Sequence, residues 1–166
     1  MNFISKDNKI SVKSLVKIAI TAALYAVATT AIAPLSYGAV QFRFSEVMTL
    51  LAFVDPVYIP GLVLGCALSN LYSPLGIVDV VVGTTATFLS VYMISKTKHL
   101  FIASLWPTIM NSIIVGAELF FVLHQPFWIS AAYVAIGEFV VVTCIGCPLF
   151  KLLMRKENIL KVLKYQ

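Results

Sequence analysis

Apolar stretches without charge alternate along the whole chain with short groups of polar and turn-forming residues. The longest intervals that lack Asp, Glu, Lys and Arg are residues 18–42, 56–78, 80–95, 99–117 and 119–137. A helix rises 1.5 Å per residue, so about 20 apolar residues cross the roughly 30 Å hydrocarbon core of a bilayer. Each interval has about that length, and the pattern predicts an integral membrane protein.

Proline and glycine fall near the ends of these intervals, where a chain that crosses a membrane repeatedly has to turn. Pro34 with Gly38, Pro74 with Gly76, and Pro126 are examples. Together they predict one all-α membrane domain, residues 1–166, with tails at 1–12 and 154–166. Its six helices are expected near residues 13–33, 44–54, 57–72, 76–95, 100–123 and 127–153.

The second of these helices is short for a crossing. Residues 44–54 are eleven residues, which rise about 16 Å as an α-helix, half of what a perpendicular span needs. The alternative is a re-entrant hairpin over residues 44–72, which is tolerated where protein covers its backbone. Both alternatives leave residue 73 on the same side as residue 37, so the sidedness of the other helices is unaffected.

Composition and charge then set the class of protein and its orientation. The chain is 60% hydrophobic and only 11% charged, with a mean hydropathy of +0.96, whereas about a quarter of the residues in a soluble domain are charged. Eleven of the twelve basic residues fall on one side of the predicted bundle, and only Arg43 falls on the other. By the positive-inside rule both termini are cytoplasmic, so the net charge of +5 does not call for a nucleic-acid partner.

Four carboxylates lie inside the predicted helices, where insertion costs about 2.5–3.5 kcal/mol each at the bilayer centre, so each needs a partner or a use. They are Glu46, Asp79, Glu118 and Glu138. All four lie in the outer half or at the midplane, together with Asn70 and with Asn111, which precedes Glu118 by two turns on nearly the same helix face. The sequence therefore predicts a polar, outward-open site for a cation or a donor-rich neutral molecule.

Less specific explanations stay open for several of these residues. Glu46 and Asp79 lie close enough to the surface to reach water or to pair with Arg43. Glu118 and Glu138 lie deeper, so they are either neutral or meet a ligand. Tyr37 and Phe42 share an outward loop with Gln41 and could stack on a planar ligand, or belong to the aromatic belt of membrane proteins.

Small residues on the first helix offer a surface for another helix. Ala19 with Ala23, and Ala22 with Ala26, form two small-xxx-small pairs, which packing inside the protein explains equally well. Cys144 and Cys147 form a lone CxxC without a second pair, and no metal site or cofactor is expected. The chain has no GxxxxGK[ST], HExxH or GxSxG motif, so we expect no catalytic residue, and transport energy must come from elsewhere.

Residues 23–80 resemble the QueT family, small substrate-binding S components of energy-coupling factor (ECF) transporters in Gram-positive bacteria that are assigned to the uptake of queuosine precursors. The resemblance rests on ALY at 23–25, PLSYGAVQFRFSE at 34–46, IPGLVLGC at 59–66, Asn70 and SPLGIVDV at 73–80. Residues 81–166 match that family in hydropathy, length and scattered polar positions.

This resemblance implies a six-helix S-component bundle with cytoplasmic termini and high affinity for its substrate. It also implies partners: a transmembrane coupling subunit, which docks on the first helix around Ala19, Ala22, Ala23 and Ala26, and two cytosolic ATPases. The implied substrate is a 7-deazaguanine such as 7-aminomethyl-7-deazaguanine. Alternatives are an S component for another vitamin-like compound, a proton-coupled transporter or exporter of small cations, and a structural subunit without a ligand.

Each part of such a ligand has a candidate partner here. The guanine-like edge of the ligand offers N–H donors to a carboxylate, and the ligand carbonyl accepts a hydrogen bond from an amide. The ligand ring stacks on an aromatic side chain, and its aminomethyl group is a cation. We expect Glu138 or Glu118 at the ring edge and Asp79 or Glu46 at the amine. We expect Asn70 or Asn111 at the carbonyl and Tyr37 or Phe42 against the ring, with Gln41 and Arg43 in the same loop.

Overall fold

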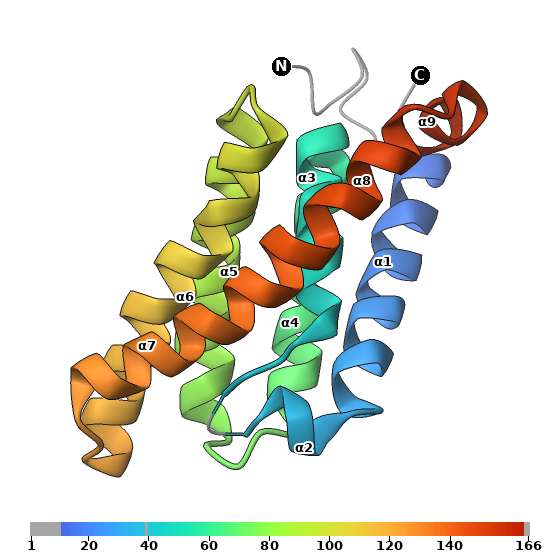
Figure 1. The fold of residues 1–166 in the computed structure, drawn as a ribbon. Helices are drawn as coiled ribbons and strands as arrows, with labels where there is room; N and C mark the ends of the chain where they lie inside the picture. The colour runs from blue at the N-terminus through green and yellow to red at the C-terminus, as the bar shows by residue number, and fades with distance from the viewer. Residues whose placement is uncertain (1–10, 39, 165–166) are drawn as a thin grey trace.

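The structure, a computed structural model of the chain, describes residues 11–38 and 40–164 (Figure 1). These residues form helices joined by turns and short extended segments, without a β-strand among them, which confirms the all-α class. Residues 1–10 of the predicted first tail, and residues 165–166 of the last, lie outside the described residues.

Four helical stretches are long and apolar enough to cross a membrane. They are α1 (Val12–Thr30), α5 (Ile77–Lys96), α6 (Leu100–Leu123) and the run Phe127–Met154. The last run consists of α7 (Phe127–Glu138), a π-helical stretch η3 (Phe139–Gly146) and α8 (Cys147–Met154). The first helix ends at Thr30 rather than at the predicted residue 33, because the short α2 (Ala33–Ser36), which contains Pro34, begins a new turn there.

The difficult segment, residues 44–54, is only partly α-helical. It forms a 3₁₀-helix, η1 (Phe44–Leu50), and a single α-turn, α3 (Leu51–Val54), after residues 41–43, which belong to no helix. A 3₁₀-helix rises about 2.0 Å per residue, so this stretch reaches farther than an α-helix of equal length. In Figure 1 it runs from the end of the bundle near α2 towards the end near α9.

The chain then returns through η2 (Pro56–Tyr58) and α4 (Ile59–Asn70), which packs closely along α1. The close approach depends on Gly65: a Cβ there would lie 2.7 Å from the Cβ of Tyr25 and 2.8 Å from the carbonyl oxygen of Ala22. Ala22 is accordingly buried against α4, so it is less suited to docking than an exposed residue, and docking on α1 stays a prediction. Ala26 is half-buried, whereas Ala19 and Ala23 are exposed.

The start of α1 and the last helix, α9 (Glu157–Leu163), meet at one end of the bundle, which we call the α9 end (Figure 1). Lys17 Nζ and the Tyr58 hydroxyl each donate a hydrogen bond to the Leu163 carbonyl, both at 2.8 Å. Residues 154–166, predicted as a tail, thus include the helix α9. Leu163 at its end packs on the hydrophobic core. The opposite end, which we call the α2 end, carries α2, the α4–α5 turn and the α6–α7 turn.

Candidate functional site

A cavity of about 200 Å³ opens at the α2 end. Its walls come from the loop after α2, the turn between α4 and α5, the first turn of α5, and the end of α6 with the residue Gln125 beyond it. Three predicted site residues line this cavity: Tyr37, Gln41 and Asp79. Of the two candidates for stacking on a ligand ring, Tyr37 lines the cavity and Phe42 packs on the hydrophobic core, and stacking itself stays a prediction.

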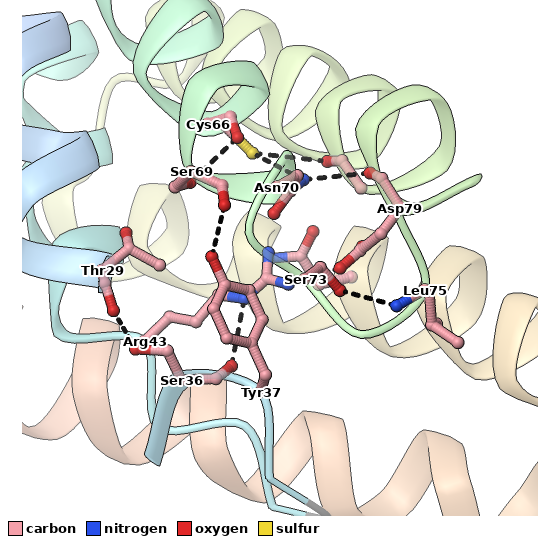
Figure 2. Close-up of polar contacts among 12 residues, drawn as sticks. Thr29, Ser36, Tyr37, Arg43, Cys66, Ser69, Asn70, Ser73, Leu75 and Asp79 are labelled. Carbon is pink, nitrogen blue, oxygen red and sulfur yellow. Dashed lines mark hydrogen bonds and ion pairs between the residues drawn. The ribbon is translucent and has the colours of Figure 1, made fainter. Parts of the chain in front are cut away.

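A buried ion pair stands beside the cavity (Figure 2). Arg43 Nη2 lies 3.4 Å from Asp79 Oδ2, and the two side chains are 3% and 4% exposed. Arg43 Nε also donates to the Ser36 carbonyl at 3.3 Å, and its guanidinium lies 5.4 Å from the centre of the Tyr37 ring. Asp79 thus has the Arg43 partner that the sequence left open as one alternative.

Tyr37 connects the loop after α2 to α4 by a hydrogen bond. Its hydroxyl donates to the Ser69 carbonyl at 2.6 Å, as Figure 2 shows. Partial burial raises the pKa of Tyr37 above its ordinary value, so the phenol stays neutral and remains a donor. One ring face meets Arg43, and the loop from Tyr37 to Arg43 is held at both of its ends.

Asn70 supports the Arg43–Asp79 pair from α4. Its Nδ2 donates to the backbone carbonyl of Asp79 at 3.0 Å and to Cys66 Sγ at 3.4 Å. Gly83 leaves room for this contact, because a Cβ there would lie 2.7 Å from both Asn70 Nδ2 and Asp79 Oδ1. Asn70 is therefore engaged within the protein, although its Oδ1 has no hydrogen-bond partner among the described residues.

Glu46 is wholly buried between α1 and α5. Its Oε1 accepts from the Tyr25 hydroxyl and, at 3.4 Å, from Thr87 Oγ1. Sequence reasoning missed both donors. A tyrosine within an apolar helix was the available signal for the first, because a buried tyrosine hydroxyl usually has a partner.

Glu138 and Asn111 form a second buried pair, between α7 and α6. Asn111 Nδ2 donates to Glu138 Oε1 at 2.6 Å, and Glu138 Oε2 finds no partner within residues 11–38 and 40–164. The neighbouring Gly137 lets the backbone at Gln41 approach α7, since a Cβ at residue 137 would collide with the Gln41 carbonyl. The loop from Tyr37 to Arg43 is thereby brought against α7 beside Glu138.

Glu118, on the same face of α6 as Asn111, is buried without a partner. It is 4% exposed, and neither of its carboxylate oxygens has a hydrogen-bond partner in the part of the chain that the structure describes. Asp79 and Arg43 are close enough to interact with it electrostatically. Its chain neighbour Leu119 and the nearby Asp79 line the cavity, whereas Glu118 itself is not among the lining residues.

These residues define a site without the features of a metal centre. Among the described residues, no group of three or more His, Cys, Asp and Glu side chains is placed to hold a metal ion. Four carboxylates, three amides and one guanidinium are buried in the apolar helical bundle, and of these Asp79 and Gln41 line the cavity. The fold and the site are those of an α-helical membrane protein with a partly polar cavity at one end of its bundle.

Comparison with known proteins identifies the family. The chain matches the QueT transporter family over residues 15–155, which extends the resemblance through the second half. It is 34% identical to the queuosine precursor transporter QueT of Lactococcus lactis subsp. cremoris (strain MG1363), over 75% of this chain and 83% of that protein. No solved structure matches the chain. The chain belongs to the QueT family, a transporter family rather than an enzyme family, and is a protein of the cell membrane.

Proposed function

We propose that this chain is the substrate-binding S component of an ECF-type ABC importer for queuosine precursors, 7-deazaguanines such as 7-aminomethyl-7-deazaguanine. The Lactococcus relative is a queuosine precursor transporter, which supports the substrate class. The observation that carries the proposal is the pair Glu118 and Glu138, buried carboxylates with unpartnered oxygens close to the cavity and to the loop that lines it.

The bundle crosses the membrane six times in this proposal, with the α9 end in the cytoplasm. Four crossings are the long apolar helices, and residues 41–54 and α4 supply the other two by running from the α2 end to the α9 end and back (Figure 1). Orientation follows from the basic residues that gather at the α9 end: Lys13, Lys17, Lys96, Lys98, Lys151, Arg155, Lys156, Lys161 and Lys164. The cavity then opens to the outside.

The ligand contacts that we propose use mainly buried polar atoms without a hydrogen-bond partner among the described residues. Glu138 Oε2 is suited to accept N–H groups of the guanine-like edge, while Asn111 orients the other oxygen and keeps a second amide hydrogen for the ring carbonyl. Glu118 is suited to the aminomethyl cation. Asp79 and Glu46, the earlier candidates for the amine, also keep one unpartnered oxygen each, but Arg43 already pairs with Asp79 and Glu46 is wholly buried, so Glu118, with neither oxygen engaged, is better suited to the cation.

Binding by the isolated protein is the direct test of this function. Calorimetric titration of the purified protein in detergent with 7-aminomethyl-7-deazaguanine should give a sub-micromolar Kd, which corresponds to about 8 kcal/mol or more. Guanine and thiamine serve as controls and should bind at least a hundredfold more weakly. If folded protein gives no heat with any 7-deazaguanine, the proposed substrate is wrong.

Docking to the coupling subunit should use the exposed pair Ala19 and Ala23 on α1, since small residues let helices approach closely in lipid. Changing both to Leu should greatly reduce co-purification with the coupling subunit and the two ATPases. Ile20→Leu, at an exposed position on the same helix, is the volume-matched control. Recovery of cytosolic ATPases also tests the orientation, because an α9 end outside the cell could not recruit them.

Unchanged recovery in the double variant would contradict this docking surface.

The buried, unpartnered Glu118 also keeps one alternative function open, a proton-coupled transporter of small cations. Cation uptake into vesicles that contain this protein alone, driven by a proton gradient, would favour that alternative over the S component.

A further inference from the structure

We propose that Glu118 selects the cationic form of the ligand by exchanging its own carboxyl proton for the ammonium group of the ligand. Each cation that enters the site then releases one proton to the outside. The inference rests on the proposed function and adds to it a specificity-determining residue and a coupling between substrate and proton.

The buried charges do not balance without protons. Arg43 is the buried basic side chain among the described residues, and it is paired with Asp79. Glu46, Glu118 and Glu138 are also buried, and residues 11–38 and 40–164 hold no other buried basic side chain to pair with them. An isolated buried carboxylate costs several kcal/mol, so three ionised ones in one apolar bundle would be very unfavourable. The empty protein therefore holds protons on this group.

Glu118 is the member least equipped to carry a negative charge. Glu46 has the donors Tyr25 and Thr87, and Glu138 has the Asn111 amide, whereas neither oxygen of Glu118 has a donor among the described residues. A carboxylate that accepts hydrogen bonds is stabilised relative to one that does not. In the empty site, Glu118 is therefore the carboxyl group that holds a proton most readily.

The surroundings of Glu118 supply no substitute cation. The charged groups that face it are Asp79, on the packed helix α5, and Arg43, which that same Asp79 occupies. Of the other elements packed on α6, α7 carries Glu138, η1 carries Glu46 and η3 carries no charged residue, while Lys151 of α8 is exposed. Near the outer ends of α6 and α7, His124 is exposed and lies beyond Leu123, so it does not enter the interior.

Exchange keeps the charge of the site constant. The O–H bond of the Glu118 carboxyl breaks, its proton leaves through the cavity, and the resulting carboxylate accepts hydrogen bonds from the ammonium group. A neutral 7-cyano-7-deazaguanine brings no positive charge and cannot release this proton. The affinity for the cationic ligand should therefore rise about tenfold per pH unit where Glu118 is protonated in the empty site, and that for the nitrile should stay flat.

Calorimetry in buffers of different ionisation enthalpy measures the exchange directly. Purified protein is titrated with the 7-aminomethyl and the 7-cyano ligand at one pH in phosphate, HEPES and Tris. The slope of the observed enthalpy against buffer ionisation enthalpy gives the protons released. We expect about one for the amine and about none for the nitrile. Glu118→Gln should abolish release and the preference for the amine, while Glu157→Gln, exposed on α9, should behave as wild type.

Each other outcome is decisive. Tight binding of the amine without proton release overturns the exchange and leaves the proposed function standing. If proton release persists in Glu118→Gln but is lost in Glu138→Gln, the released proton comes from Glu138, and the assignment to Glu118 is wrong. If Glu118→Gln does not fold, the comparison of amine and nitrile on wild-type protein still tests the exchange. Absence of binding by every 7-deazaguanine overturns the proposed function, and this inference with it.

Discussion

Glu138→Gln is expected to weaken the binding of 7-aminomethyl-7-deazaguanine by at least a hundredfold, or about 2.7 kcal/mol. Hydrogen bonds to a charged group are each worth about 1.5–3 kcal/mol, and we assign the ring edge of the ligand to this carboxylate. The amide also brings an N–H₂ group into a place where Asn111 Nδ2 and the ligand both present donors. Titration calorimetry on the purified variant gives the change in Kd directly.

Two comparisons make this result specific. Glu157→Gln applies the same chemical change to an exposed residue of α9 and should leave Kd unchanged. The nitrile ligand shares the ring edge of the amine, so Glu138→Gln should weaken both ligands alike, unlike Glu118→Gln. A Kd within threefold of wild type would remove Glu138 from the binding site.

Arg43→Met should lower the free energy of unfolding by about 3–5 kcal/mol, the usual cost of removing one partner from a buried ion pair. Asp79 would be left as an uncompensated buried charge, and the Ser36 carbonyl and the Tyr37 ring would lose their contacts with the guanidinium. Unfolding by SDS in mixed micelles, followed by circular dichroism, measures the change.

The double variant Arg43→Met with Asp79→Asn should recover part of this loss, because it removes the charge that the single variant leaves unpaired. Arg155→Met, at an exposed position after α8, is the matched control and should stay within about 0.5 kcal/mol of wild type. A double variant no more stable than Arg43→Met would show that Asp79 is not what makes the arginine necessary.

Local patterns were enough for the parts of the fold that depend on hydropathy and chain length. The apolar intervals predicted long helices at α5 and α6 within one or two residues of the observed bounds. They failed for residues 44–54, where the prediction assumed the rise of an α-helix and most of the segment is a 3₁₀-helix. The short segment is covered by α1, α5 and η3, and that tertiary cover makes irregular backbone acceptable at this depth.

The candidate site shows the same division between local and tertiary information. A carboxylate in an apolar helix is visible in the sequence, because its desolvation cost demands an explanation wherever it is placed. Its partner is not visible: Glu46 meets Tyr25, Asp79 meets Arg43, and Glu138 meets Asn111, at separations of 21, 36 and 27 residues. Only the packing of the helices distinguishes the engaged carboxylates from Glu118.

By itself, the sequence of this protein determined its membrane character, its all-helical class, the basic side of the bundle and the presence of buried acids, and its motifs pointed to the correct family. These properties depend on transfer free energies and chain spacing, which are sums over nearby residues. Only the tertiary structure decided which alanines of α1 are free, which loop residue lines the cavity and which carboxylate lacks a partner. Those answers depend on the rotation and contact of helices far apart in the chain, which a local pattern does not specify.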